Sequence, residues 1–240
     1  MGVIAVSTQN FNLASDTALI TACCGGDTAV AAPLIAATSS ASGAIEFLLN
    51  PVLGKLADRL GRKGVYYIGP LVSGVGMSAA VLLSNGRSLP ILLAHRAMGW
   101  ALISMSCSFI APITTSDMYS GKELGVQLAQ LFAMFGLGVT IAPPLGMLIM
   151  QRTGDALNVY KLRLASALVQ LGFLWFAIPE TLERRNIRPF RLADLSPFRF
   201  VALRKAPGTL RTLAAVLFFN FMAEGKNIIS LMQIYMALHQ

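Results

Sequence analysis

The sequence predicts an all-α, polytopic transmembrane protein, and three observations support this fold class. Hydrophobic residues make up 55% of the 240 residues and charged residues only 12%, about half of the roughly 25% that a soluble domain carries. The apolar residues form long continuous blocks rather than alternating with polar ones. The basic residues cluster between these blocks. Because such a composition cannot cover a water-facing surface, the sequence excludes a soluble globular domain.

The positive charge is located where a membrane protein needs it. The formal net charge is +8 and the pI is about 9.8, which in a soluble protein would indicate nucleic-acid binding. Here four basic residues lie between Lys55 and Lys63, and eight more lie between Arg184 and Arg211. Both clusters border apolar blocks, as the cytoplasmic loops of membrane proteins do. The sequence therefore predicts the lipid bilayer as a partner and no nucleic acid.

Residues 1–28 form a mixed segment that is predicted not to span the membrane. Polar residues interrupt its apolar runs, among them Asn12 and Asp16, whereas a span needs about 20 mostly apolar residues. No basic stretch precedes an apolar one, which excludes a signal peptide.

Six apolar segments that follow are predicted to span the bilayer. The fourth contains Pro143 and Pro144, which are expected to bend the helix because proline removes backbone donors. The fifth carries Lys161 and Arg163 in its first turn, and both are expected to reach the membrane interface. The predicted spans are residues 29–53, 65–83, 90–115, 125–150, 159–178 and 210–238.

The segments between the spans predict the orientation of the chain. If Gly54–Lys63 lies in the cytoplasm, alternation places loops 84–89 and 151–158 outside and loops 116–124 and 183–208 inside. The outside loops contain only Arg87 and Arg152 as basic residues, so the positive-inside rule is satisfied. The predicted organisation is a five-helix unit up to residue 182, a basic cytoplasmic central loop at 183–208, and the first helix of a second unit at 209–240.

Four charged residues lie within predicted spans beyond their first turns: Glu46, Arg96, Glu224 and Lys226. Ionisable groups within a bilayer are costly and are functional candidates by default. Glu46 can carry a proton if burial favours its neutral form. Arg96 is expected to face a cavity or a partner, and the alternative is an interfacial side chain next to His95. Glu224 and Lys226 do not share a helix face, so structural pairing is the alternative to a role in coupling or substrate binding.

The residue types needed for catalysis or metal binding do not occur at useful spacings. The cysteines Cys23, Cys24 and Cys107 and the two histidines lack metal-ligand spacing. No nucleophile has a general base at a suitable distance along the chain. The sequence therefore predicts neither an enzyme nor a bound cofactor or metal.

The segment between the first two predicted spans contains a specific motif. Within it, Asp58 and Arg62 are four residues apart, so on a helical turn they share a face and can pair. Gly61 permits a sharp turn, and Gly54 permits the close approach of another backbone. The segment reads Gly54-Lys55-Leu56-Ala57-Asp58-Arg59-Leu60-Gly61-Arg62-Lys63. It closely resembles the cytoplasmic signature G-x-L-A-D-R-x-G-R-K of the major facilitator superfamily, which lies between that family's second and third helices.

This resemblance implies a gate. In the family, the aspartate equivalent to Asp58 caps a helix in the other half of the transporter, where free N–H groups and the helix dipole favour a carboxylate. The arginine equivalent to Arg62 pairs with an aspartate at the cytoplasmic end of the fourth helix, a place that Asp117 occupies here. By resemblance, these residues form a latch favouring the outward-facing state, in a signature that also includes Gly54, Arg59, Gly61 and Lys63.

Three further segments are similar to the same family. Arg96 occupies the place of an arginine implicated in proton coupling in antiporters, although Gly99 follows it after three residues where the family has four. The P-E-T-L that often ends the sixth family helix is matched by residues 179–182. The antiporter motif G-x-x-x-G-P-x-x-G-G resembles the fourth span, where small residues make a face for close packing. The matching residues are Gly138, Ala142, Pro143 and Gly146, and a plain packing face is the alternative interpretation.

The resemblance covers roughly residues 29–238 and implies a partial major facilitator fold with spans corresponding to family helices two to seven. It implies a secondary active transporter of a small solute, working by alternating access with protons, and most similar to the drug–proton antiporter and tetracycline-efflux branch. Because counterparts of family helices one and eight to twelve are not found, we expect an incomplete chain that needs those helices or a second chain. The alternatives are a facilitative uniporter and a non-transporting interaction or regulatory membrane protein derived from a transporter.

Overall fold

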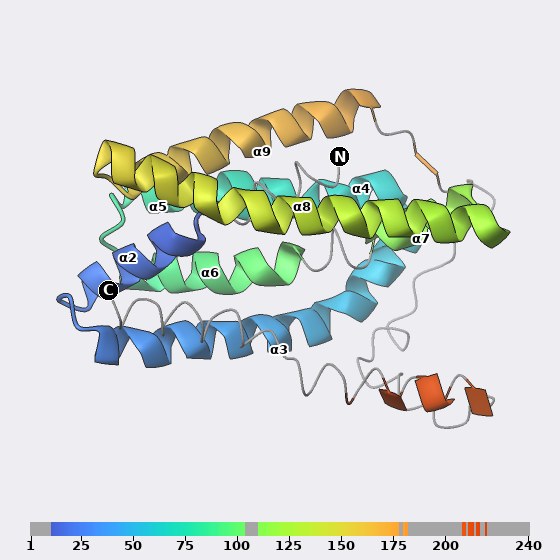
Figure 1. The fold of residues 1–240 in the computed structure, drawn as a ribbon, viewed down its shortest axis with the longest axis horizontal. Coiled ribbons are helices and arrows are strands. Elements are labelled where there is room, and N and C mark those ends of the chain that lie inside the picture. Colours follow the sequence, from blue (N-terminus) through green and yellow to red (C-terminus); the bar gives the residue numbers. More distant parts are fainter. Residues whose placement is uncertain are drawn as a thin grey trace.

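The chain folds into a bundle of helices that lie along a common long axis (Figure 1). The computed structural model describes residues 11–103, 110–177, 180–181, 208–209, 211–213, 215–216 and 219. The all-α fold predicted from the sequence is confirmed for these residues. Its main elements are α2 (Leu13–Cys23), α3 (Thr28–Leu60), α4 (Arg62–Tyr66), the π-helix η1 (Pro70–Met77), α5 (Ser78–Leu83), α6 (Leu89–Ile103), α7 (Ala111–Met118), α8 (Gly121–Thr153) and α9 (Leu157–Ala177).

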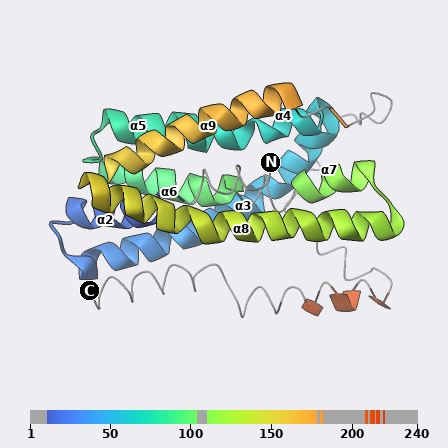
Figure 2. The same cartoon turned by 45° about the horizontal axis from the view of Figure 1, so that its top comes forward.

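Helix α6 lies in the interior of the bundle, where it contacts α2, α3, α5 and η1. Helix α9 packs along η1 and α5, and α8 packs against α2, α7 and α9. Figures 1 and 2 show α3 and α9 on opposite sides of the bundle, with α6 between them. Side chains from α2, η1, α6 and α9 can therefore meet in the interior.

Three stretches of the described chain are long and apolar enough to cross a membrane: Thr28–Asn50, Arg62–Leu83 and Gly121–Thr153. They correspond to the first, second and fourth predicted spans. Helix α9 occupies the fifth, but its polar residues, including Lys161 and Arg163, lower its hydropathy. Residues 104–109 of the third predicted span and most of the sixth lie outside the described ranges.

The N-terminal segment contributes helix α2 to the bundle. This helix has 11 residues, so it is about 16 Å long, compared with about 30 Å for the hydrocarbon core of a bilayer. Positive φ angles at Gly25 and Gly26 reverse the chain after it, and Asp27 caps α3 by accepting a hydrogen bond from the backbone N–H of Ala29 at 2.8 Å. The polar Asp16 is buried, because α2 directs it into the bundle.

The two loops that the sequence predicts at 54–63 and 116–124 are largely helical, which corrects that prediction. Helix α3 continues to Leu60 and α4 begins at Arg62, while only two residues separate α7 from α8. Both α3 and α8 have 33 residues, so each is about 50 Å long and projects beyond a hydrocarbon core of about 30 Å. The hydropathy of the sequence indicates only where the apolar part of each helix ends. The helices themselves continue beyond that point with charged residues.

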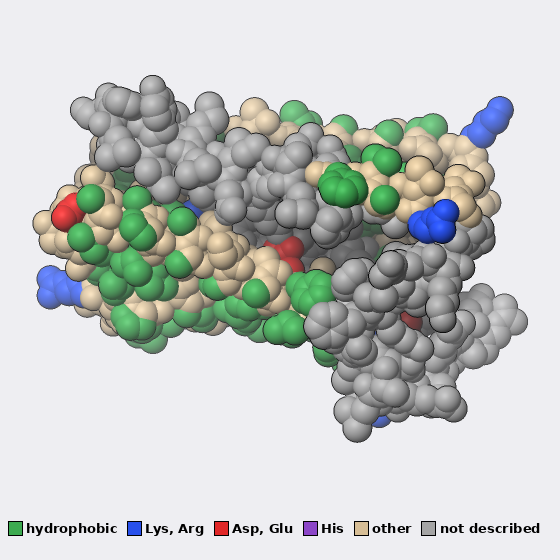
Figure 3. Space-filling model, turned by 90° about the horizontal axis from the view of Figure 1, so that it is seen from below, with side chains coloured by type: hydrophobic (Ala, Val, Ile, Leu, Met, Phe, Trp, Pro, Cys, Tyr) green, Lys and Arg blue, Asp and Glu red, His purple; other side chains and the backbone are tan. Residues whose placement is uncertain are grey.

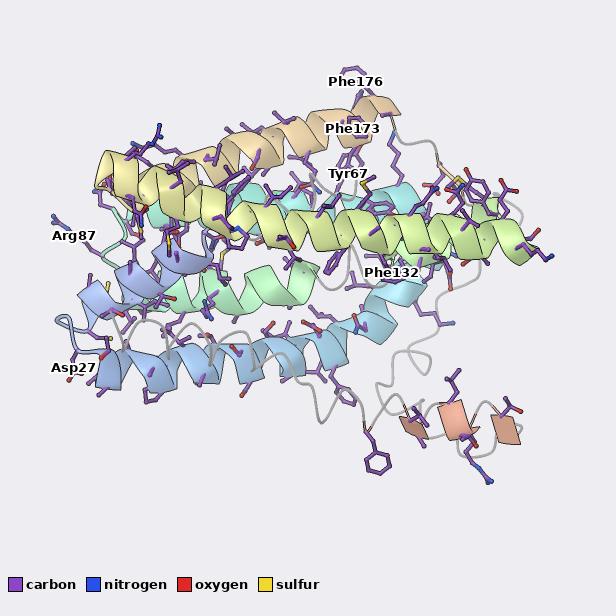
Figure 4. The ribbon with its side chains drawn as sticks, in the orientation of Figure 1. Asp27, Tyr67, Arg87, Phe132, Phe173 and Phe176 are labelled. Carbon is purple, nitrogen blue, oxygen red and sulfur yellow. The ribbon has the colours of Figure 1, made fainter. Side chains whose placement is uncertain are left out.

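The outer surfaces of α8 and α9 carry large exposed hydrophobic side chains, as expected for lipid contact. They include Phe132 on α8 and Phe173 and Phe176 on α9, and Figure 4 shows Phe176 directed away from the bundle. In Figure 3, hydrophobic side chains are spread over the described part of one face. Asp27 and Arg87 lie at the same end of the bundle (Figure 4), which is the end predicted to face outside.

Candidate functional site

Arg62 lies between two carboxylates at the end of the bundle that is predicted to be cytoplasmic. Its Nη1 donates a hydrogen bond to Oδ1 of Asp58 at 2.8 Å, and its Nε donates to Oδ2 of Asp117 at 3.0 Å. Asp58 lies in the last turn of α3 and Asp117 in the last turn of α7. The single guanidinium therefore connects the ends of α3, α4 and α7. Such a network contributes more than an isolated exposed pair, which contributes about 0–1 kcal/mol.

Glu180 caps helix α4 next to this network. Its Oε1 accepts a hydrogen bond from the backbone N–H of Arg62 at 2.8 Å, and its Oε2 accepts one from that of Lys63 at 3.2 Å. A carboxylate here satisfies the first N–H groups of the helix and the positive end of its dipole. Gly61 has φ 94°, and a Cβ at that position would overlap the Glu180 carboxylate. The sequence placed Glu180 in the P-E-T-L segment but did not indicate this contact.

A second set of polar residues is buried in the interior of the bundle around Asp16 of α2. Its Oδ1 accepts hydrogen bonds from Nδ2 of Asn12 at 2.7 Å and from the hydroxyl of Tyr160. Nδ1 of His95 lies 3.7 Å from the same oxygen, and the rings of His95 and Tyr160 have centroids 5.2 Å apart. Asp16 is 4% exposed and His95 is fully buried. Helices α2, α6 and α9 thus converge on one carboxylate. We call Asp16 and the buried polar residues around it the Asp16 cluster.

Arg163 of α9 belongs to the Asp16 cluster. Its Nη1 donates to Oδ1 of Asn12 at 2.6 Å, and its Nη2 donates to Oγ of Ser73. Its side chain is 1% exposed and interacts electrostatically with Asp16. The expectation that Arg163 reaches the membrane interface is therefore wrong. The guanidinium points into the bundle because Asn12 and Ser73 offer hydrogen bonds that lipid does not. Lys161, two residues earlier, is exposed as expected.

Arg96 and His95 are both buried in α6. Arg96 is 1% exposed and interacts electrostatically with Asp16, so the alternative of an interfacial Arg96 beside His95 is excluded. Neither ring nitrogen of His95 forms a hydrogen bond to any described residue. The Asp16 cluster therefore combines one carboxylate, one imidazole and two guanidinium groups.

The π-helix η1 positions Ser73 beside Arg163. Pro70 begins this helix, and because proline has no backbone N–H it interrupts regular α-helical hydrogen bonding. Gly74 permits close packing with α9, since a Cβ there would overlap that of Ala167. Short π-helical segments are frequent at functional sites. The sequence predicted an ordinary span at 65–83 and not this change of helix type.

The small-residue face of α8 packs against the start of α2. Gly138, Ala142 and Gly146 are the buried residues of this helix. A Cβ at Gly146 would overlap the backbone carbonyl of Phe11, so the glycine permits this close approach. Helix α8 continues as one element through its two adjacent prolines. The face has a direct packing function in the described structure.

The other candidate residues occupy separate positions. Glu46 lies in α3 and is buried, with 9% of its surface exposed. In the signature segment, Gly54 is half-buried and Arg59 is exposed. Glu224 and Lys226 lie outside the described residues.

Asp16 was not indicated as a site residue by the sequence, although a signal was present. Asn12 and Asp16 are four residues apart, and Tyr160 and Arg163 are three apart, which places each pair on one helix face. These polar residues were interpreted only as interruptions of apolar segments, and that interpretation does not show that each pair shares a helix face.

The chemistry of the Asp16 cluster follows from its burial. Removing charged groups from water costs several kcal/mol per ion unless they are paired and hydrogen-bonded. A change in the protonation of Asp16 therefore alters its balance with both guanidinium groups. Within the described part of the chain, no group of three or more His, Cys, Asp or Glu side chains is placed to hold a metal ion. The cluster is suited to binding a proton or a charged group.

Comparisons with known proteins connect these features to one family. The family model described as Major Facilitator Superfamily matches residues 3–240. The chain is 30% identical over 142 residues to the uncharacterized MFS-type transporter YfiU of Bacillus subtilis (strain 168), which covers 57% of this chain and 26% of that protein. It is 27% identical over 127 residues to the multidrug transporter protein MdtP of the same organism. That match covers 52% of this chain and 22% of the relative. These matches span about a quarter of the length of either relative.

A solved structure with the same fold is that of the human organic anion transporter MFSD10 (TETRAN). It matches with a TM-score of 0.63 and 22% sequence identity, covering 88% of this chain and 57% of that one. The family model matches almost the whole sequence, and the helices and the signature segment fit it. The chain is therefore an integral, multi-pass membrane protein that belongs to the major facilitator superfamily.

Proposed function

We propose that this chain forms part of a secondary active transporter that moves a small solute across the membrane by alternating access, in exchange for protons. Membership of the family and the similarity to transporters support the transport activity. The observation that carries proton coupling is the Asp16 cluster, in which a buried carboxylate is placed among ionisable groups of α6 and α9. Buried ionisable groups in membrane helices commonly belong to substrate or proton pathways.

Proton coupling requires a group whose charge affects the helices that move. Ionised Asp16 is a counter-charge for both Arg96 and Arg163. A proton on Asp16 removes that counter-charge, so the two guanidinium groups repel each other without compensation. The charge of Asp16 thereby changes which arrangement of helices is more stable. In this proposal Arg96 couples protonation to conformation, and Glu46 is a further candidate.

The Arg62 network is proposed to act as a latch on the cytoplasmic side. Separating the ends of α3, α4 and α7 requires breaking the contacts of Arg62 with Asp58 and Asp117. Gly61 supports the latch because it lets Glu180 cap α4 beside that arginine. The latch therefore favours the state in which these ends are closed.

The proposed solute is a small, drug-like organic molecule that is exported. The relative MdtP is named a multidrug transporter, and the face made by Gly138, Ala142 and Gly146 is similar to an antiporter motif. Transporters of this kind place the solute between two halves of the protein. We propose that the complete pathway needs helices beyond this bundle, either on the same polypeptide or from a second chain.

Everted membrane vesicles test the proposal. Vesicles containing the complete transporter are acidified by ATP hydrolysis, and the internal pH is followed with a fluorescent dye. Added ethidium is expected to enter the vesicles and to release part of the proton gradient. The Asp16→Asn variant should lose proton release, while the exposed control Lys161→Gln should retain it.

The possible outcomes separate the components of the proposal. Ethidium movement that is independent of the gradient would indicate a facilitative uniporter and refute coupling. No movement of ethidium or of a fluorescein-type organic anion would refute the transport proposal for these solutes. Transport by the 240-residue chain alone would refute the need for further helices.

A further inference from the structure

His95 is a buried titratable residue that the proposed coupling of Asp16 to the two arginines does not use. It lies in α6 and is fully buried. Its Nδ1 is 3.7 Å from Oδ1 of Asp16, and neither ring nitrogen forms a hydrogen bond to a described residue. Leaving a buried polar group without a hydrogen bond costs free energy, so a purely structural role would favour a bonded geometry.

The groups around His95 determine its charge. Asp16 faces it from α2, Tyr160 and Arg163 face it from α9, and Arg96 belongs to its own helix. Two guanidinium groups and a single carboxylate disfavour a further positive charge. Burial and these guanidinium groups therefore favour the neutral imidazole, which has one nitrogen that donates and one that accepts.

The 3.7 Å separation indicates which nitrogen accepts. A donating Nδ1–H beside an ionised carboxylate would approach to about 2.8 Å. Ionised Asp16 only accepts hydrogen bonds, and its Oδ1 already accepts them from Asn12 and Tyr160. An accepting Nδ1 facing this oxygen has no proton to share with it, which accounts for the unbonded distance. An accepting Nδ1 corresponds to a ring that carries its proton on Nε2.

We propose that His95 is a relay partner of Asp16: its Nδ1 accepts a hydrogen bond from the Asp16 carboxyl when that carboxyl carries the transported proton. A protonated carboxyl becomes a donor, and the two groups need to move only about 1 Å closer to form the bond. The proton comes from water on one side of the membrane and is returned to water on the other. The inference rests on the proposed proton coupling and adds a residue to it.

Two substitutions separate the ring nitrogens of His95. Asparagine at this position places an amide near Nδ1, whereas glutamine places one near Nε2. His95→Asn should therefore retain coupling and His95→Gln should reduce it about five- to tenfold, the effect of one hydrogen bond. In everted vesicles the readout is proton release by ethidium between pH 6 and 8, with uncoupled ethidium movement as the measure of intact folding. If both variants follow the wild-type pH profile, the relay is refuted while the proposed function stands.

A second measurement is independent of transport. In protein labelled with ¹⁵N-histidine, the His95→Gln variant identifies the ring signals of His95, which is one of the two histidines in this sequence. The Nδ1 signal of His95 should change between pH 8 and pH 5 as Asp16 takes up its proton. In Asp16→Asn, whose amide is a permanent donor, it should stay at the hydrogen-bonded value.

These two readouts give distinct outcomes. An Nδ1 signal that is identical in the wild type and in Asp16→Asn at every pH would overturn the inference. If that signal responds as expected but the wild type shows no proton release, the pairing stands and the proposed function fails.

Discussion

Replacing Gly61 with alanine is expected to destabilise the protein through two separable effects. Gly61 has φ 94° and ψ 160°, a conformation that is essentially restricted to glycine because any Cβ is strained there. The new Cβ would also overlap the Glu180 carboxylate, which caps α4 through the N–H groups of Arg62 and Lys63. The substitution therefore strains the backbone and displaces a cap.

The two effects have similar magnitudes. A non-glycine residue in this region costs about 1–3 kcal/mol. Loss of a side-chain cap costs about 0.5–2 kcal/mol, and the lower half of that range applies because the contact of Glu180 with Lys63 is exposed. Together they give about 2–4 kcal/mol, which for a protein of this size lowers Tm by roughly 5–15 °C.

A double-mutant cycle in detergent separates the two effects. Tm is measured by heating followed by size-exclusion chromatography for Gly61→Ala, Glu180→Ala and the double variant. The expected coupling energy is about 0.5–1 kcal/mol, because Gly61→Ala cannot displace a carboxylate that is already absent. Gly172→Ala is the matched control, since a Cβ at this glycine of α9 meets nothing within 4 Å. It should raise or preserve Tm, because alanine favours a helix over glycine.

Two results would contradict this reasoning. Equal losses from Gly61→Ala in both backgrounds would show that the alanine does not displace the Glu180 cap. A decrease in Tm below about 2 °C would show that the backbone at Gly61 is not strained.

Three further substitutions test other contacts. Gly146→Leu should cost about 1–3 kcal/mol by overpacking, because its side chain would overlap the Phe11 carbonyl; an unchanged Tm would contradict the close approach of α2 and α8. Arg163→Met should cost about 3–5 kcal/mol by leaving buried polar partners without a donor, and thermal unfolding should show no similar loss when the exposed lysine two residues earlier is replaced. Arg62→Lys should slow ethidium transport roughly tenfold, because lysine lacks the fork that bridges Asp117 and a second carboxylate; a wild-type rate would exclude a latch that depends on this geometry.

The long helices and the pairing of Asp58 with Arg62 were accessible from the sequence because both depend on local patterns. A continuous apolar block predicts a buried or spanning helix, and a spacing of four residues places two side chains on one helical face. The position of Asp117 followed from resemblance to a family. The helix ends were placed too early because Lys55, Leu56 and Ala57 are good helix formers that continue α3 into the polar region.

The Asp16 cluster was not predictable in the same way. Tyr160 lies 144 positions from Asp16 along the chain, and Arg163 lies 151 positions from Asn12. Each of these residues is an ordinary polar interruption in its own helix. Only the packing of α2, α6 and α9 places them on one carboxylate, and no local periodicity contains that information.

The contacts of α9 with the segment α4–η1–α5 occur along its whole length. Arg163 bonds Ser73 near the predicted outer end, and α9 packs on η1 and α5 beyond this point. At the other end, Nζ of Lys63 donates to the carbonyl of Trp175 at 3.0 Å, and Glu180 caps α4. Since many independent contacts would have to break together, these two segments are expected to move as one unit.

The ionisable contacts between this unit and the rest of the bundle are different in kind. Asp16 and Asn12 join α2 to α9 through hydrogen bonds with Tyr160 and Arg163. Arg62 joins α4 to α3 and α7 through one guanidinium. In the proposed mechanism, a proton on Asp16 weakens the connection between α2 and α9 without creating a cavity. Another cation that binds Asp58 or Asp117 weakens the connection made by Arg62. Packed interfaces are bistable rather than continuously deformable. In the proposed mechanism, a change at these two points therefore favours a second arrangement of α2, α3 and α7 against the unit. Charge removal at Asp16 and latch disruption at Arg62 should therefore act on the same conformational equilibrium, and their effects on ethidium transport should be non-additive.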